Sequence, residues 1–209
     1  MKQWSDADMG KEESKWHFAF DLDGTITSEE LLPRIAEAVG LRDEIAKLTE
    51  LTMAGRIPFA YSFQERVKLL QNIPVSAVRK IVESVDTDPH IVTFLQQNAD
   101  RCYIVTGNLD VWVGALCVRL GAKLISSSAL VRDDRIADLT SIVDKRVAAR
   151  TIPRPFAAIG DGHNDLGMLE AADVAVAFGG VHPPAQSLLR AATHAIYDGA
   201  ALCRFLRQL

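Results

Sequence analysis

The chain has 209 residues, 48% of them hydrophobic and 24% charged, and a formal net charge of −4. It is long enough to bury a sizeable core. The acidic balance argues against a nucleic-acid partner, and no stretch reaches the roughly 20 apolar residues of a membrane span. Its three cysteines, Cys102, Cys117 and Cys203, predict reduced core thiols of a cytoplasmic protein rather than a disulfide framework or a zinc site.

The first part of the chain predicts an arm, a strand and then a series of helices. Residues 1–15 are polar and form the expected arm, and residues 16–20 are an apolar run typical of a strand. Apolar residues then recur at helical spacing, with glycines and prolines at the breaks. The four predicted helices cover residues 31–39, 45–51, 59–70 and 75–85. With no strand between them, residues 28–87 are expected to be an inserted helical cap.

Strand and helix patterns alternate through the remainder of the chain. The expected strands are 102–105, 123–125, 156–159 and 174–178, and the expected helices are 89–98, 111–120, 145–150, 166–171, 185–192 and 200–206. Residues 129–138 predict a hairpin, with Asp133 and Asp134 at its turn. This alternation is typical of an α/β fold with a doubly wound parallel sheet. Residues 16–27 and 88–209 are therefore expected to form the core.

Two segments far apart in the chain carry the chemical signal. Asp21 and Asp23 follow the first strand, and Asp161 and Asp165 follow the strand at 156–159. Ligands of a parallel α/β sheet bind at the carboxyl ends of its strands, so these four carboxylates are expected in one crevice. Their mutual repulsion requires a cation or a proton, and carboxylate oxygens suit Mg²⁺ together with a substrate phosphate. A carboxylate pair can also supply the nucleophile and the general acid of phosphoryl transfer.

The segment Asp21-Leu22-Asp23-Gly24-Thr25-Ile26-Thr27 resembles the first signature of haloacid dehalogenase superfamily phosphatases. By this resemblance Asp21 is the nucleophile, and Asp23 is the general acid and base that also offers its backbone carbonyl to Mg²⁺. Thr106, in Val105-Thr106-Gly107-Asn108, resembles the second signature. It is expected to bind the phosphoryl group through its hydroxyl and the amide that follows.

Gly160-Asp161-Gly162-His163-Asn164-Asp165 resembles the fourth signature of the same superfamily. The resemblance makes Asp161 a Mg²⁺ ligand beside Asp21, and Asp165 a ligand or an orienting residue. Asp165 could also merely cap the helix that follows, a role that is compatible with a metal-site role. The third signature is a lysine that neutralises charge. Lys145 is the candidate, with Arg146 and Lys123 as alternatives, because the interval from Lys145 to Asp161 is shorter than in close relatives. Lys145 could also be an ordinary solvated helix residue.

The expected cap is similar to that of the phosphoserine phosphatase group, through residues 53–59, Ser62 and residues 66–70. By that similarity Glu30 contacts a substrate amine and Arg66 a substrate carboxylate, a group that the fork of arginine suits. The residues expected to bind substrate are Glu30, Met53, Phe59, Arg66, Gly107, Asn108 and Asn164. In a purely structural alternative, Glu30 and Arg66 form an ion pair, Met53 and Phe59 are core residues, and Glu29 competes for the role of Glu30.

Three positions depart from the phosphoserine phosphatase pattern. Gly24 stands where that group usually has serine, Asn108 stands where it usually has glycine, and residues 179–184 continue differently. His163 is expected to be a solvent-facing loop residue. The other histidines have no ligand spacing and are interpreted as structural.

The resulting prediction is a Mg²⁺-dependent phosphatase that hydrolyses a small phosphomonoester through an aspartyl phosphate, with O-phosphoserine as the leading substrate. The expected partner is a small phosphorylated metabolite, without nucleic acid or membrane, and the sequence predicts no oligomeric state. One alternative is a phosphotransferase to an acceptor hydroxyl such as that of homoserine. Others are a phosphatase for a different small metabolite, such as a methylthio-sugar phosphate, and a binding protein on an inactive scaffold.

Overall fold

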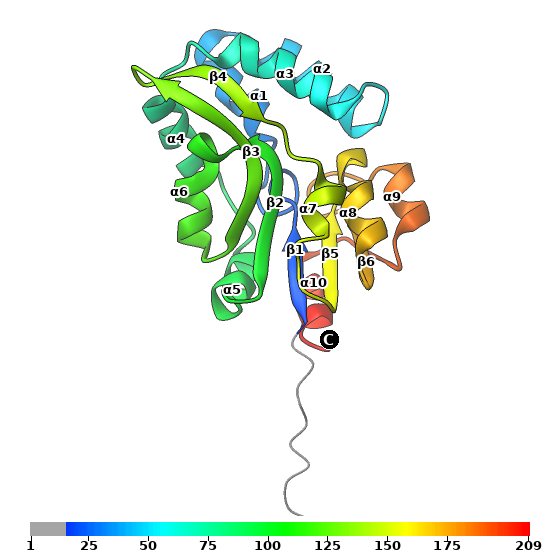
Figure 1. Ribbon diagram of the computed structural model, residues 1–209. Coiled ribbons are helices and arrows are strands. Elements are labelled where there is room, and N and C mark those ends of the chain that lie inside the picture. The colour runs from blue at the N-terminus through cyan, green and yellow to red at the C-terminus, as the bar shows by residue number, and fades with distance from the viewer. Residues whose placement is uncertain (1–15) are drawn as a thin grey trace, which may run out of the picture.

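The protein is described by a computed structural model that covers residues 16–209, so the predicted arm of residues 1–15 lies outside the described residues. A seven-stranded sheet runs through its centre in the order β4-β3-β2-β1-β5-β6-β7 (Figure 1). Every neighbouring pair is parallel except β3 and β4. The strands are β1 His17–Phe20, β2 Cys102–Leu109, β3 Lys123–Arg132, β4 Arg135–Ser141, β5 Phe156–Gly160, β6 Val174–Phe178 and β7 His194–Ile196. The predicted α/β class is confirmed.

The strand order reverses at β1. The chain proceeds from β1 through β2 to β3 on one side and then returns to β5, which pairs with the other edge of β1. Such a reversal opens a crevice at the carboxyl ends of the two central strands. Asp21 follows β1 and Asp161 follows β5, so the topology brings the two sequence motifs to this crevice.

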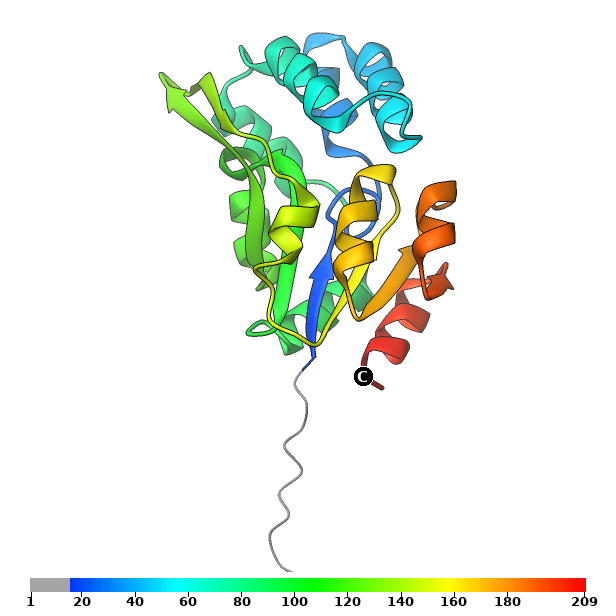
Figure 2. The ribbon, with the colours of Figure 1, turned by 45° about the vertical axis from the view of Figure 1, so that its right-hand side comes forward.

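Helices cover both faces of the sheet, because successive strand residues point to opposite faces. On β1, Phe18 and Phe20 pack into one apolar cluster and Ala19 into the other. The first cluster includes α5 Pro89–Gln97, α6 Asp110–Leu120 and α10 Gly199–Leu206, whereas the second includes α7 Lys145–Ala149, α8 Leu166–Ala171 and α9 Gln186–Ala191. Figure 2 shows α7, α8 and α9 on the same side of the strands.

Four α-helices lie between β1 and α5 in the chain. They are α1 Leu31–Ala36, continued by the 3-10 turn η1 Glu37–Val39, α2 Arg42–Met53, α3 Phe59–Leu70 and α4 Val75–Glu83. Helices α2 and α3 stand beyond the carboxyl ends of the central strands (Figure 1), while α4 also packs against α6 of the core. A bridge between Thr27 and Thr87 joins the two connecting segments. The assignment of residues 28–87 to a cap stays a prediction.

The hairpin and the state of the cysteines agree with the sequence predictions, whereas three strands were incompletely predicted. Asp133 and Asp134 form the turn between β3 and β4 with φ values of 49° and 59°, the left-handed conformation of a tight hairpin turn. The three cysteines are buried and free. Strands β2 and β3 are longer than predicted and the three-residue β7 was missed, since polar residues weaken the apolar signal there. Among residues 16–209, no helix has the length and apolar character needed to cross a membrane.

Candidate active site

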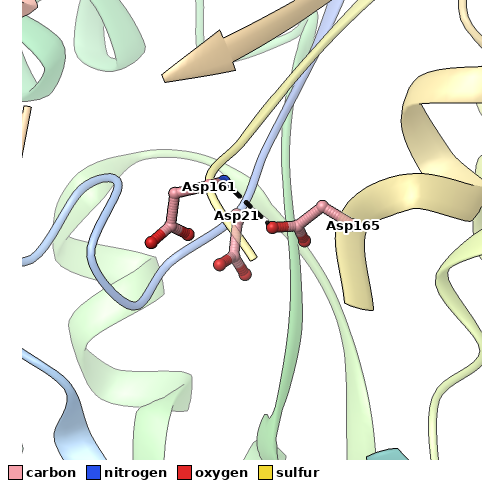
Figure 3. A group of neighbouring side chains, drawn as sticks. All are labelled: Asp21, Asp161 and Asp165. Atoms are coloured by element: carbon pink, nitrogen blue, oxygen red, sulfur yellow. Dashed lines mark hydrogen bonds between the residues drawn. The ribbon is translucent and has the colours of Figure 1, made fainter. Parts of the chain in front are cut away.

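Three of the predicted carboxylates meet at the crevice. Asp21 follows β1 and donates its N–H to the carbonyl of Ile159 in β5 at 2.9 Å. Figure 3 shows the side chains of Asp21, Asp161 and Asp165 gathered in one place, although Asp165 comes from the 3-10 turn η2, His163–Asp165. All three are buried, and one oxygen of each lies within 4.8 Å of the others. This grouping is what the sequence predicted for the strand ends.

Asp165 orients the loop that carries Asp161. Its Oδ2 accepts hydrogen bonds from the N–H groups of Asp161 and Gly162 at 3.1 and 3.0 Å, the first of which is the dashed line in Figure 3. Its side chain makes no capping bond to α8, so the alternative of an α8 cap is wrong. Gly160 provides the space, because a Cβ there would lie 2.5 Å from Cγ of Asp165.

Of the three basic candidates, Lys145 is the one that reaches the carboxylates. It begins α7, whose first turn is capped by the side chain of Asp144. Its Nζ donates to Oδ1 of Asp21 and, at 2.5 Å, to Oδ1 of Asp165. Burial alone would lower the pKa of Lys145, but Asp165 and Asp21 raise it above its ordinary value, so the ammonium remains charged. Lys145 is buried, which rules out the solvated interpretation. The alternatives are engaged elsewhere, Arg146 with Glu170 and Lys123 with the carbonyl of Asp100.

Asp23 is held between the start of the expected cap and β2. Its Oδ1 accepts the N–H of Leu31 at 2.9 Å, and its Oδ2 accepts Nδ2 of Asn108 at 2.6 Å and the Thr106 hydroxyl at 3.4 Å. Burial raises the pKa of Asp23 in spite of these bonds, which favour the carboxylate. A carboxyl group with a raised pKa is suited to carry and release a proton near neutral pH. Asn108, one of the departures from the family pattern, therefore contacts Asp23 directly.

The carboxylates outnumber the cation that compensates them. Burial and the neighbouring Asp165 raise the pKa of Asp21 to about 8, and the same two causes raise that of Asp161 well above its ordinary value. Oδ2 of Asp161 is buried without a hydrogen-bond partner, and a Cβ on Gly24 would approach it to 2.8 Å. A cluster of hard oxygen donors with one unsatisfied buried oxygen fits a divalent cation such as Mg²⁺.

A small cavity of about 40 Å³ separates these carboxylates from α2 and α3. This volume has room for about three water molecules. Lining it are all seven residues predicted to bind substrate, together with Asp21, Asp23, Leu32, Thr49, Thr52, Phe63 and Asp161. The seven predicted substrate-binding residues and three of the predicted carboxylates therefore line one cavity.

Glu30 and Arg66 face this cavity as separate charges. Arg66 is buried, donating Nε to the Ser62 carbonyl at 3.2 Å and Nη1 to the Thr49 hydroxyl at 2.9 Å. Among the described residues the pair is not within ion-pair distance, so the structural ion-pair alternative is wrong. Burial lowers the pKa of Arg66 to about 10 and raises that of Glu30 well above its ordinary value. Glu29, the alternative to Glu30, lies near Arg34 instead.

One histidine was misjudged from the sequence, and a second lies beside the candidate site. His163 is half-buried rather than solvent-facing: its Nδ1 lies 2.8 Å from the Ser187 hydroxyl, and its ring lies against Gly55. His182, interpreted as structural, has Nε2 buried 4.0 Å from Oε1 of Glu30. For His182, the signal available was its place in the segment 179–184 that departs from the family pattern. Thr49 carried no sequence signal, because only the folded helix turns its hydroxyl toward Arg66.

Comparison with known proteins decides the family. A family model described as haloacid dehalogenase-like hydrolase matches residues 18–170, and a second model of the same description matches residues 152–204. The chain belongs to this family. The phosphoserine phosphatase of Halobacterium salinarum is 34% identical over 184 residues, which cover 79% of this chain and 85% of that protein. The phosphoserine phosphatase of Methanocaldococcus jannaschii is 28% identical over 183 residues, covering 80% of this chain and 87% of that protein.

Solved structures agree on the fold. A phospho-aspartyl intermediate analogue of phosphoserine phosphatase superposes with a TM-score of 0.81 at 24% identity, covering 94% of this chain and all of that one. The resemblance to a phosphoserine phosphatase-like haloacid dehalogenase hydrolase is therefore confirmed, as is the predicted enzyme class of phosphoric monoester hydrolase. The sequence signatures located the family because its motifs are short and continuous in the chain.

Proposed function

We propose that this protein is a Mg²⁺-dependent phosphatase that hydrolyses O-phosphoserine through a phosphoaspartate at Asp21. The observation that carries the proposal is that Asp21 is bound to Lys145 through Oδ1, whereas Asp23, two residues later, is held by Asn108 of the neighbouring strand β2. The nucleophile and the proton donor are thereby separate groups in separate surroundings. A pair of carboxyl groups with different environments is typical of enzymes that need one group ionised and the other protonated.

The reaction has two balanced steps. Oδ2 of Asp21 attacks phosphorus in line with the ester bond, which breaks while Asp23 transfers its proton to the leaving serine oxygen. Asp23, now a carboxylate, accepts a proton from a water molecule, whose oxygen attacks phosphorus and releases phosphate from Asp21. Lys145 and the Thr106 hydroxyl compensate the charge of the phosphoryl oxygens throughout.

Asp21, Asp161 and the backbone carbonyl of Asp23 would hold Mg²⁺, with Asp165 orienting Asp161. Bound there, the cation would offset the charge of the phosphate and keep Asp21 ionised at neutral pH. The proposal is supported by the pKa of about 8 for Asp21 without a cation, because a protonated carboxyl group is a poor nucleophile. This predicts that phosphate release requires a divalent cation.

The assignment of O-phosphoserine rests on Glu30 and Arg66. The two side chains line one cavity without pairing, which suits a ligand that carries both an amine and a carboxylate. The relatives named above are phosphoserine phosphatases, which supports the same substrate. Glu30 would receive the amine and Arg66 the carboxylate, while Met53 and Phe59 would contact the carbon chain.

The test is phosphate release from a panel of phosphomonoesters with Mg²⁺ and with EDTA. O-phosphoserine should be the best substrate, and EDTA should abolish turnover. Preference for another small phosphate would keep the chemistry and refute the amino-acid pocket. Adding homoserine and measuring phosphorylated acceptor separates hydrolysis from phosphotransfer. No turnover of any ester, with or without acceptor, would contradict the catalytic proposal.

A further inference from the structure

His163 is the point where the core touches the turn between α2 and α3. This turn, residues 54–57, is called the Gly55 turn here. Gly55 has φ of +70°, and a Cβ built on it would lie 2.8 Å from both Cδ2 and Cγ of His163. Because such a distance is far below van der Waals contact, only a glycine lets the backbone approach the ring this closely.

The ring is fixed from the side of the core. Nδ1 of His163 lies 2.8 Å from the hydroxyl of Ser187, in the first turn of α9. The backbone of His163 belongs to η2, and the side chain of Asp165 accepts the N–H of Gly162, which precedes His163, at 3.0 Å. The half-buried ring is held by its backbone and by Ser187, so its position is fixed. The ring therefore limits how closely the Gly55 turn can approach the core.

The position of the Gly55 turn determines two walls of the cavity. Met53 ends α2 immediately before the turn and Phe59 begins α3 immediately after it, and both line the cavity. The ring of Phe59 also lies against Gly107, where a Cβ would collide with it. A shift of the turn away from His163 would therefore move Met53 and loosen the contact between Phe59 and β2.

The place of the contact gives it a role in turnover. Met53 and Phe59, on either side of the Gly55 turn, line the cavity together with Asp21 and Asp161. Closure of such a segment over bound substrate excludes water from the reaction. The contact with His163 would therefore define the closed position of the turn.

We propose that His163 is a positioning residue for this active site: its ring, held by Ser187, is the surface on which the Gly55 turn closes, and it thereby places Met53 and Phe59 around the substrate. The inference rests on the proposed phosphatase function. It deepens that function by naming the residue of the core that determines the closed position of the substrate pocket.

Gly40 provides a matched control for perturbing the turn. Gly40 has φ of +69°, ends a helical segment in the same way, and has nothing within 4 Å of a built Cβ. Both glycines also donate their N–H to the carbonyl three residues earlier, Gly55 to Thr52 and Gly40 to Glu37. Gly55→Ala and Gly40→Ala therefore impose the same backbone strain, but only Gly55→Ala pushes against His163.

The first measurement is steady-state kinetics of the two alanine variants. Gly55→Ala should raise KM for O-phosphoserine by about tenfold relative to Gly40→Ala, with a smaller change in kcat, since the pocket walls rather than the reacting groups are displaced. His163→Ala and Ser187→Ala should raise KM in the same direction, and His163→Phe, which keeps a ring, should recover part of the loss. Equal KM values for Gly55→Ala and Gly40→Ala would overturn the proposal.

The second measurement does not depend on turnover. Hydrogen exchange of the Gly55 and Arg56 amides, which bond to Thr52 and Leu51, should be faster in His163→Ala and Ser187→Ala than in the wild type. The Gly40 and Leu41 amides serve as internal reference. Unchanged exchange at the turn would refute the role of His163 even if the enzyme is active, whereas faster exchange without any turnover would refute only the phosphatase. His163 lies between Asp161 and Asp165 in the chain, so the Mg²⁺ affinity of Ser187→Ala is also measured and compared with that of the wild type. If Ser187→Ala loses Mg²⁺ affinity by as large a factor as its KM rises, the proposal is overturned.

Discussion

The substitution Asp21→Asn should abolish turnover and at the same time stabilise the metal-free protein. Burial and Asp165 raise the pKa of Asp21 from 3.8 to about 8, even though Lys145 favours the charged form. At about pH 7 the folded protein therefore holds a proton that the unfolded chain releases, which costs about 4 kcal/mol of stability. Asparagine has the same shape, still accepts a hydrogen bond from Lys145 through Oδ1 and avoids this cost. We expect a gain approaching that figure.

Urea unfolding of both proteins in EDTA measures the stability, and phosphate release with saturating Mg²⁺ measures the activity. Asp21→Asn should show a higher midpoint with an unchanged slope, no turnover, and a smaller stabilisation by Mg²⁺ than the wild type, because one ligand charge is lost. Asp173→Asn is a matched control, since Asp173 is an aspartate far from the site whose pKa is lowered by its partners, and its loss should destabilise. Substantial turnover by Asp21→Asn, or a lower stability in EDTA, would refute the reasoning.

Three further predictions follow from the charges of the site. Lys145→Met leaves the buried Asp165 carboxylate and the Asp21 carboxyl group without their cation, so stability in EDTA should fall by about 3–5 kcal/mol and kcat by about 10²-fold or more, measured by urea unfolding and phosphate release. Arg66→Met should lower kcat/KM for O-phosphoserine by about 10²-fold or more but leave that for O-phosphoethanolamine, which lacks the carboxylate, nearly unchanged; an equal loss on both would contradict the pocket. Asp21 and Asp161 have raised pKa values, so the folded protein binds more protons than the unfolded chain. The contribution of Asp21 to stability falls as pH rises between about 4 and 8, and that of Asp161 changes in the same direction. Since Mg²⁺ displaces those protons, its effect on Tm should be larger at about pH 8 than at about pH 6, and equal shifts would count against the cation site.

The sequence was sufficient to predict the α/β class, most strands of the sheet and the carboxylate cluster, because each depends on local patterns. An apolar run that ends in aspartate and glycine indicates both a strand and the end of the sheet at which its carboxylates lie. Lys145 remained ambiguous for the opposite reason. Its role depends on the direction in which the five residues of α7 point its side chain, and a spacing in sequence does not determine this direction.

Contacts between segments that are distant in the chain could not be predicted from the sequence. Nothing in the pattern around His163 indicates that Gly55, more than 100 residues earlier, lies against its ring. The short strand β7 has only three residues, so its period is not recognisable, and its pairing with β6 depends on the sheet already being formed. The sequence also does not give the distance between Glu30 and Arg66, because that distance depends on how α1 and α3 pack. Only the packed structure shows that the two residues do not form an ion pair.

Two of the departures from the family pattern lie beside carboxyl groups of the site. Asn108 donates to Asp23, while the bare Cα of Gly24 leaves space shared by Asp161, Glu30 and the ring of His182. Around Asp21, by contrast, the contacts with Lys145 are those that the signatures imply. In the proposed reaction, attack on phosphorus would depend on Asp21 and Lys145, whereas protonation and recognition of the leaving group would depend on Asp23 and Glu30. The departures beside Asp23 and Glu30 would then affect the leaving group more than the attack on phosphorus, so we expect this chain to differ from its relatives in the leaving group that it accepts.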